Sequence, residues 1–272
     1  MARGSRWTYD ELVLALDLYC RTPFGRLHAR NAEIIGLAEA IGRTPDAVAM
    51  KCCNFASLDP AERARGVRGL TGTSEADEEV FARYAHDVAA LDEARTAAMA
   101  RLGIPTSAEA AEPEPAATDL DRLAERLSGP AEGNDGTALR RVRRLRALFR
   151  QIVLVSYEST CAVCDLAVAD LLDAAHIVPW GTDVAGRLDP ANGIAMCVLH
   201  HRAFDRGLLS VAPDNRIMLA EHVRRDDAAP MHRVALLEIE GKFVRLPRRF
   251  TPPPDAFAFH RTNVFRSPST NE

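Results

Sequence analysis

The sequence has very little lysine and no long apolar segment. Lys51 and Lys242 are its only lysines, and an apolar run such as Ile152 to Val155 is far too short to cross a bilayer. The first residues, MARGSRWTYDEL, lack the apolar stretch of a secretory signal, so we expect a cytoplasmic protein with no membrane partner. With 47% hydrophobic and 26% charged residues, the composition excludes collagen, coiled coil and global disorder.

The net charge of −4 argues against a protein that coats nucleic acid along its whole surface. The charge is unevenly distributed, because residues 103–135 carry eight acids and two arginines, a net of −6, so that the remainder carries about +2. Almost all of the positive charge is arginine, whose planar guanidinium can donate two hydrogen bonds at once to a phosphate. A codon bias towards arginine would explain this enrichment equally well.

The length of 272 residues allows one large domain or two ordinary ones. Residues 102–136 contain AEAAEPEPAATD and are rich in Ala, Pro and Glu, so they bury too little apolar surface to fold and are predicted to be a linker. We therefore predict an α+β protein with a helical domain over residues 1–101 and a second domain over residues 137–272.

The first domain is predicted to consist of amphipathic helices. Residues 7–19 carry apolar side chains at helical spacing, with Thr8 as the N-cap and Glu11 completing a capping box. A second amphipathic helix covers residues 32–41 and ends at Gly42. The cysteines of this domain have no second ligand pair nearby, so they are interpreted as small apolar core residues; these are Cys20, Cys52 and Cys53.

A third helix begins after Gly42, with Thr44 as its N-cap and Pro45 at its first position. Two helices joined by a short turn that contains glycine resemble a helix-turn-helix. In that interpretation the third helix enters the major groove of DNA, and Lys51 and Asn54 lie near its exposed side. The alternative is a small helical bundle in which the turn is only a connection.

An arginine-rich helix is predicted over residues 138–157. Its arginines occupy more than one face of the helix, so some of them must point to solvent or to a polyanion. Because the run has a single sign and directly precedes a predicted metal site, we favour contact with phosphates over a merely solvated face. The arginines expected to bind DNA are Arg140, Arg141, Arg143 and Arg144.

Four residues after this helix have the spacing of a tetrahedral zinc site. Cys161 and Cys164 form a C-x-x-C pair, and Cys197 and His200 form a C-x-x-H pair after an intervening loop. Thiolate and imidazole are ligands that zinc accepts, and each pair closes a small chelate ring. The sequence therefore predicts a structural zinc ion bound by all four residues.

His201 follows His200 directly, and on a helix neighbouring side chains point about 100° apart. Cys197 and His200 share one face of a helix that starts near Cys197, whereas His201 and Asp205 share another. This geometry predicts two separate sites, a structural zinc and a second ion beside His201 and Asp205. Asp205 suits a hard ion such as Mg²⁺, and His201 suits a transition ion such as Mn²⁺ or Ni²⁺.

The segment from Cys161 to Gly207 resembles the HNH nuclease motif of the ββα-metal fold. The predicted order of strand, loop, short strand and helix agrees with that fold, and His176, Asn192 and His201 match its first His, its Asn and its last His. The cysteine pairs match the zinc-stapled branch of the family, in which a fourth cysteine is common at the position of His200. The form AAHI…NGI…C…HH-AFD-G is similar to that of bacterial restriction endonucleases.

The resemblance implies roles for individual residues. His176 would be the general base that activates water, and Asn192 would brace the loop that orients it. His201 and Asp205 would hold the catalytic divalent ion. Many family members carry an acidic or His ligand at the position of Ala175; here Asp173, on the same face of a strand, would replace that ligand directly or through water.

The resemblance further implies a metal-dependent DNA endonuclease that leaves 5′-phosphate and 3′-hydroxyl ends. A role in restriction or antiviral defence, with modified DNA as one target, rests on the resemblance alone. Double-stranded DNA is the expected partner, and cutting both strands with one active site would favour a homodimer. The alternatives are a DNA-binding regulator whose zinc module is only structural, and an RNA-directed nuclease or toxin.

Beyond Gly207 the pattern predicts two hairpins that extend the nuclease core. LLSVAPDNRIMLA turns around Pro213 to Asn215, and residues 236–246 turn at Glu240-Gly241. His260 is interpreted either as a contact to the DNA backbone or as a buried histidine at the end of a strand.

Overall fold

The computed structural model describes residues 6–64, 72–105, 135–183, 186–225 and 227–266, with the side chains of 135–140 left out. The chain divides into two compact units. The first unit comprises residues 1–114 and 138–148, and the second comprises residues 115–137 and 149–272. Most of the predicted linker lies outside the described residues. None of the helices in the described ranges has the length and apolarity needed to cross a bilayer.

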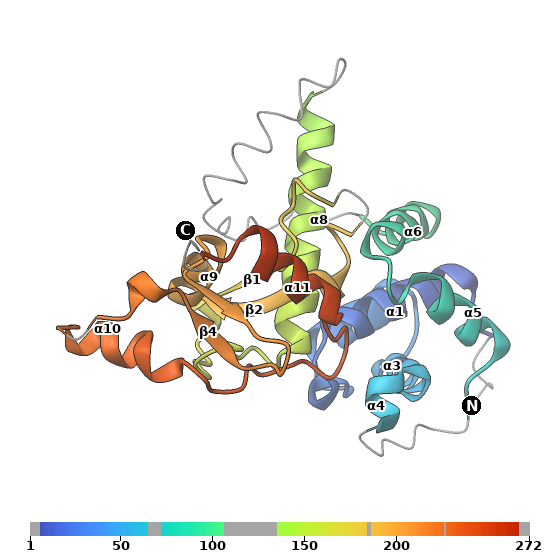
Figure 1. The fold of residues 1–272 in the computed structure, drawn as a ribbon. Helices are drawn as coiled ribbons and strands as arrows, with labels where there is room; N and C mark the ends of the chain where they lie inside the picture. The colour runs from blue at the N-terminus through green and yellow to red at the C-terminus, as the bar shows by residue number, and fades with distance from the viewer. Residues whose placement is uncertain (1–5, 65–71, 106–134, 184–185, 226, 267–272) are drawn as a thin grey trace. The chain divides into compact units, whose positions relative to one another are not determined.

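The first unit consists of helices (Figure 1). Each predicted helix start is present: Thr8 caps the first helix in a capping box with Glu11, and Thr44 caps the third, with Pro45 at its first position. Gly42 follows the second helix at a φ of +67°, a left-handed conformation that glycine adopts without strain. The helices are α1 (Tyr9–Arg21), the 3₁₀ turn η1 (Phe24–Arg26), α2 (Ala32–Ala40), α3 (Pro45–Leu58), α4 (Pro60–Ala64), α5 (Glu75–Tyr84) and α6 (Val88–Arg101).

The core of this unit surrounds α1, which is buried along most of its length. An aromatic cluster joins three helices: the ring of Tyr19 lies 6.3 Å from that of Phe55 and 6.4 Å from that of Phe81. The Tyr19 hydroxyl donates a hydrogen bond of 2.7 Å to the carboxylate of Asp59. Cys20 and Cys52 are buried in this core, and Cys53 is half-buried.

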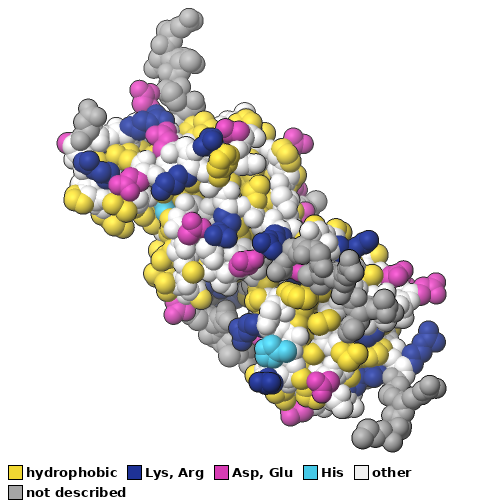
Figure 2. Space-filling view, turned by 90° about the horizontal axis from the view of Figure 1, so that it is seen from below, with side chains coloured by type: hydrophobic (Ala, Val, Ile, Leu, Met, Phe, Trp, Pro, Cys, Tyr) yellow, Lys and Arg dark blue, Asp and Glu magenta, His cyan; other side chains and the backbone are white. Residues whose placement is uncertain are grey.

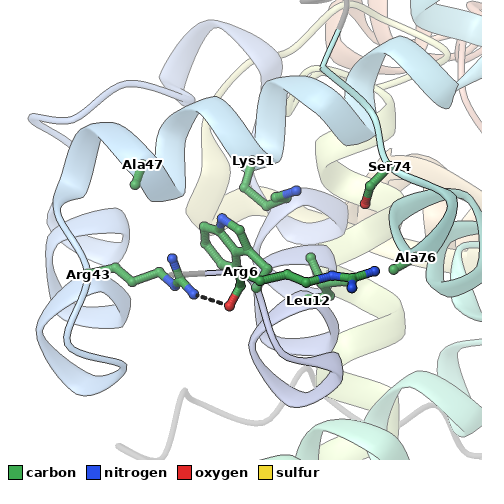
Figure 3. A pocket seen from close by; sticks show the side chains of 8 residues that line it. Arg6, Leu12, Arg43, Ala47, Lys51, Ser74 and Ala76 are labelled. Carbon is green, nitrogen blue, oxygen red and sulfur yellow. Dashed lines mark hydrogen bonds between the residues drawn. The ribbon is translucent and has the colours of Figure 1, made fainter. Parts of the chain in front are cut away.

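Lys51 and Asn54 do not lie on the exposed side of α3, and the prediction that they face DNA is wrong. Their exposed fractions are 7% and 8%. The Lys51 ammonium donates to both carboxylate oxygens of Asp77, at 2.7 and 2.9 Å, and Asn54 donates to the carbonyl of Gly72. Lys51 also lines a pocket of about 350 Å³ beside Trp7 (Figure 3). The helix instead exposes Asp46 and Met50.

The arginine-rich helix is α8 (Asp135–Ser156), of which residues 138–148 belong to the first unit and residues 149–156 to the second. Within the first unit, Arg144 forms a bidentate ion pair with Asp92, at 2.9 and 2.7 Å, and Arg141 pairs with Glu93. Asp92 is 1% exposed, so the guanidinium of Arg144 neutralises a buried charge. Arg143 is exposed, and the side chain of Arg140 lies outside the described residues. On the face drawn in Figure 2, basic side chains are interspersed with acidic ones.

The second unit is built around an antiparallel pair of strands followed by a helix. Strand β1 (Leu172–His176) pairs with β2 (Gly193–Cys197), so that His176 lies opposite Gly193, and α9 (Val198–Asp205) follows β2 directly. Gly193 is required by close packing, because a Cβ there would lie 2.4 Å from a methyl of Val153 and 2.9 Å from the ring of Phe149. The order β1–β2–α9 is the predicted strand, strand and helix.

The rest of this unit covers the ββα core. The first predicted hairpin is present as β3 (Leu209–Val211) and β4 (Ile217–Leu219), which are antiparallel. The second is not: residues 236–246 contain a 3₁₀ turn and only an isolated bridge between Arg216 and Phe243. The remaining elements are η2 (Ala169–Leu171), η3 (Pro190–Asn192), η4 (Glu221–Val223), α10 (Pro230–Ala235), η5 (Leu237–Ile239) and α11 (Pro254–Asn263).

Candidate metal and catalytic centres

Three cysteines and one histidine form a compact cluster in the second unit. Their ligand atoms all lie within 4.8 Å of one another, and the members are Cys161, Cys164, Cys197 and His200. The first two belong to a tight turn after α8, in which the Cys161 amide donates to the Leu166 carbonyl. Cys197 ends β2, and His200 lies in the first turn of α9.

The imidazole of His200 is oriented by a backbone carbonyl. Its Nε2 lies 2.8 Å from the carbonyl oxygen of Ala235, and because a carbonyl only accepts, Nε2 carries the proton. Nδ1 then faces the sulfurs, 3.2 Å from Cys197 and 3.7 Å from Cys161. A hydrogen bond that fixes the outer nitrogen of a ligating histidine is the usual support of a metal site.

The thiols of the cluster share negative charge. A hydrogen bond from the Cys197 thiol lowers the pKa of Cys161 to about 3, while the same contact raises the pKa of Cys197. Burial raises the pKa of Cys164. Three cysteine sulfurs and one imidazole are a donor set that Zn²⁺ prefers, so this cluster, of which Cys164 alone is exposed, can hold a structural zinc ion.

A second group of ionisable side chains meets at His201, on the other face of α9. Nδ1 of His201 lies 3.6 Å from a carboxylate oxygen of Asp173 on β1, and Nε2 lies 3.3 Å from a carboxylate oxygen of Asp205. Burial favours the neutral ring, but the two carboxylates prevail and raise the pKa of His201 to about 10. His201 is therefore an imidazolium held between two carboxylates.

Arg150 of α8 also binds Asp173. Its Nε lies 3.1 Å from the Asp173 carboxylate, and its terminal nitrogen donates to the Leu172 carbonyl at 2.8 Å. Burial would raise the pKa of Asp173, but the contacts with His201, the Ala174 amide and Arg150 lower it. The sequence places Arg150 in the basic run but gives no indication of this partner.

The group around His201 differs from the cysteine cluster in how its ligand atoms lie. In the described residues, only one set of three or more His, Cys, Asp or Glu side chains brings all its ligand atoms within 4.8 Å of one another, and that set is the cysteine cluster. Asp173 and Asp205 instead lie against opposite nitrogens of His201. Carboxylate and imidazole are nevertheless donors that a divalent ion accepts, and such an ion would replace the proton on one nitrogen of His201.

His176 has different neighbours from His201. It is the last residue of β1, and its ring stacks on that of Phe149 at 4.5 Å and 8°. The ring of Trp180 meets it edge-on at 5.4 Å and 87°. Nε2 of His176 lies 2.9 Å from the Arg187 carbonyl and therefore carries the proton, which leaves the lone pair on Nδ1. Asp173 is three residues away, and strand alternation directs it to the opposite face.

Asn192 closes the loop between β1 and β2. Its side-chain oxygen accepts from the Val178 amide at 2.8 Å, and its nitrogen donates to the Val178 carbonyl at 3.0 Å. Its own carbonyl accepts from the Ile177 amide. These bonds bind both ends of the loop to each other directly beside His176.

Residues 161–212 match the family model described as HNH endonuclease. The chain carries an HNH domain. The matched residues include β1, β2, α9 and the cysteine cluster, and His176, Asn192 and His201 lie within the matched range. An HNH endonuclease domain acts on nucleic acid, and the domain supports nuclease activity in general. No curated protein matches the chain.

The structure adds neighbours of the HNH residues that sequence reasoning missed. Phe149 and Trp180 hold the His176 ring, Arg187 binds its outer nitrogen, and Ala235 does the same for His200. Two of the contacts are made by main-chain oxygens, which leave no signal in a sequence.

Proposed function

We propose that this protein is a metal-dependent DNA endonuclease that hydrolyses phosphodiester bonds to 5′-phosphate and 3′-hydroxyl ends. The observation that carries the proposal is the HNH match over residues 161–212, which covers His176, Asn192 and His201 together. Restriction or defence against foreign DNA is the setting that the resemblance favours, with double-stranded DNA as the substrate and a homodimer as the unit that cuts both strands.

His176 is proposed as the general base. The Arg187 carbonyl holds the proton on Nε2, so Nδ1 is the nitrogen that can take a proton from an attacking water. Stacking on Phe149 covers one face of the ring and restricts its rotation. An imidazole titrates near neutral pH, which suits a base that must accept and then release a proton.

Asn192 is proposed as a positioning residue. Its two bonds to the Val178 backbone hold the segment that follows His176, and it also lies 3.5 Å from the Gly186 carbonyl, one residue before Arg187. The side chain of Asn192 therefore orders two segments that contact His176, the one that continues to Val178 and the one that ends at Arg187. Loss of Asn192 would release His176 without removing it.

Asp173, His201 and Asp205 are proposed to hold the catalytic divalent ion, with Mg²⁺, Mn²⁺ and Ni²⁺ as candidates. When bound, such an ion would supply stabilisation of the negative charge that develops at the phosphate and at the leaving oxygen. The chain's own part is to bring the three side chains together from β1 and α9. Arg150 keeps Asp173 ionised and oriented towards His201.

The cysteine cluster is proposed to bind zinc that shapes the domain without entering the reaction. The helical unit is proposed to contribute to DNA recognition, because α2 and α3 are joined by a short turn at Gly42, as in a helix-turn-helix. Arg143, which is exposed on α8, is the member of the basic run best placed to meet a phosphate.

The test is cleavage of plasmid DNA by the full-length protein with Mg²⁺, Mn²⁺ or Ni²⁺. We expect nicking or linearisation that is lost in His176→Ala and retained in His222→Ala, an exposed histidine of the same unit. Loss of a general base typically costs about 10² to 10⁴ in rate. Binding without cleavage under every metal would favour the structural regulator, and cleavage of RNA alone would favour the RNA-directed nuclease.

A further inference from the structure

Arg187 contacts the proposed base directly through its backbone and indirectly, through Trp180, with its side chain. Its backbone carbonyl accepts the Nε2 proton of His176 at 2.9 Å. Its guanidinium carbon lies 4.9 Å from the centre of the Trp180 ring, and that ring meets His176 edge-on at 5.4 Å. The backbone of Arg187 thus contacts the imidazole, and its guanidinium lies against the tryptophan ring that meets the same imidazole. Asn192 donates hydrogen bonds to the carbonyls of Val178, which follows His176, and of Gly186, which precedes Arg187.

Arg187 forms no ion pair with an acidic side chain among the described residues. Other arginines of this unit are paired: Arg150 with Asp173, Arg245 with Asp165 and Arg225 with Asp227. Arg187 has an aromatic neighbour instead, which restricts the guanidinium by a cation–π contact without neutralising it. Its positive charge is therefore retained against the Trp180 ring, which in turn contacts His176.

The hydrogen-bonding capacity of this guanidinium is also incompletely used. Nε of Arg187 is buried and has no hydrogen-bond partner in the described structure. The residue as a whole is half-buried, so it keeps some contact with solvent. A guanidinium that is held in place but lacks an acceptor is suited to an oxygen that arrives with a ligand.

We propose that Arg187 binds a phosphate of the nucleic-acid backbone beside His176, with Trp180 as the platform that presents the guanidinium. This inference deepens the proposed function and rests on it for the identity of the ligand. The fork of arginine donates to two phosphate oxygens at once, and the position next to the base brings the bound phosphate close to the bond that is cut. Arg187 is thereby a substrate-binding residue as well as the backbone support of His176.

The experiment compares Arg187→Ala and Arg187→Lys with wild type and with Arg225→Ala, whose arginine is exposed and paired with Asp227. Binding of a duplex DNA oligonucleotide is measured over a range of salt without added divalent ion, and cleavage is measured with the ion that supports it. Zinc content and thermal unfolding report whether each variant is folded, and Arg187→Gln replaces the alanine variant if that variant unfolds.

We expect Arg187→Ala to weaken binding about tenfold or more and to reduce the slope of log K against log[salt] by about 0.9, the value for one lost phosphate contact. Arg187→Lys should keep the slope and recover part of the affinity, because it keeps the charge but lacks the fork. Arg225→Ala should match wild type in both measurements, and His176→Ala should keep the slope while losing cleavage.

An Arg187→Ala protein with the slope and affinity of wild type would overturn the inference, whether or not its turnover changes. If its turnover alone fell, the Arg187 side chain would act only through its packing on Trp180, because the substitution leaves the backbone carbonyl in place. Failure of the proposed function gives a different result, since wild type would then cut no nucleic acid under any metal. In that case a reduced salt slope for Arg187→Ala would still assign the phosphate contact to this residue.

Discussion

The two ring nitrogens of His201 contact two different carboxylates, Asp173 on β1 and Asp205 one turn further along α9. The imidazole therefore bridges the strand and the helix of the HNH core. His200, its neighbour in the chain, makes the same kind of bridge for the sulfur cluster, between Cys197 and the Ala235 carbonyl. Two consecutive residues thus serve two separate centres, as the helical spacing predicts.

Asp173→Asn is expected to weaken the metal dependence of cleavage without unfolding the protein. The substitution removes one negative donor beside His201 and leaves the shape of the side chain nearly unchanged. We expect the concentration of divalent ion needed for half-maximal cleavage to rise by about tenfold or more. Titration of the ion against cleavage rate measures the change. An unaltered titration curve would show that Asp173 is not a ligand.

Cys161→Ser is expected to release zinc and destabilise the second unit. A structural zinc site contributes folding free energy, so removing one thiolate lowers both metal content and thermal stability. Metal analysis should give one zinc per wild-type chain and much less in the variant. Cys53→Ser is the control, because Cys53 is half-buried in the first unit and outside the cluster. Normal zinc content in Cys161→Ser would contradict the assignment.

Asn192→Ala is expected to lower turnover while zinc content stays normal. The substitution leaves the amide and carbonyl of Val178 without their side-chain partner, and a lost hydrogen bond of this kind costs about 1 to 3 kcal/mol. Hydrogen exchange at the Val178 amide should accelerate in the variant. If exchange there is unchanged, the loop is held by other contacts and Asn192 is not its brace.

Gly193→Ala is expected to disturb the base from the opposite strand. The added methyl would lie 2.4 Å from Val153 and 2.9 Å from the ring of Phe149, which itself stacks on His176. Overpacking of this kind typically costs about 1 to 3 kcal/mol. Gly181→Ala is the matched control, since nothing lies within 4 Å of its added methyl. Equal stability and turnover of the two variants would refute the packing argument.

His260 is expected to make the second unit less stable in acid. Burial is the main cause that lowers its pKa to about 4, and Arg261 adds to it. The ring is 1% exposed, and Ser210 and the Phe204 carbonyl occupy its two nitrogens. The unfolded chain binds a proton near pH 6.5, so folding is progressively disfavoured as pH falls from about 6.5 to 4.

The size of this effect follows from the difference in pKa between the two states. A difference of about 2.5 units corresponds to about 3 kcal/mol of unfolding free energy lost by pH 4. Urea unfolding at pH 7 and pH 5 measures the loss, and His260→Gln, which does not titrate, should lose less than wild type. Equal losses in the two proteins would show that other groups set the acid sensitivity.

Local patterns predicted the parts of the fold that depend on neighbouring residues. Thr8 and Thr44 mark helix starts because a cap needs only the next three residues. The pairs Cys161/Cys164 and Cys197/His200 meet because each pair is preorganised by its own turn. In the same way, strand alternation brought Asp173 to the side of β1 that contacts His201.

Contacts between distant residues could not be predicted in this way. The helical pattern predicted an exposed Lys51, because its partner Asp77 lies 26 residues further on and nothing near Lys51 indicates that pair. Arg144 and Arg150 belong to the same basic run in the sequence, yet Arg144 binds Asp92 and Arg150 binds Asp173. Residues 236–246 alternate as a strand would, but without a long partner strand they form a turn and a single bridge.

The adjacency of His200 and His201 has a practical consequence for handling the protein. A chelator strong enough to remove a zinc ion from the cysteine cluster would also displace the imidazole of His201, because His200 and His201 are consecutive on α9. Inactivation by such a reagent would then be slow to reverse, whereas exchange of a weakly held ion beside His201 would be rapid. A preparation assayed after exhaustive dialysis against chelator should therefore recover only when zinc is returned before the second ion.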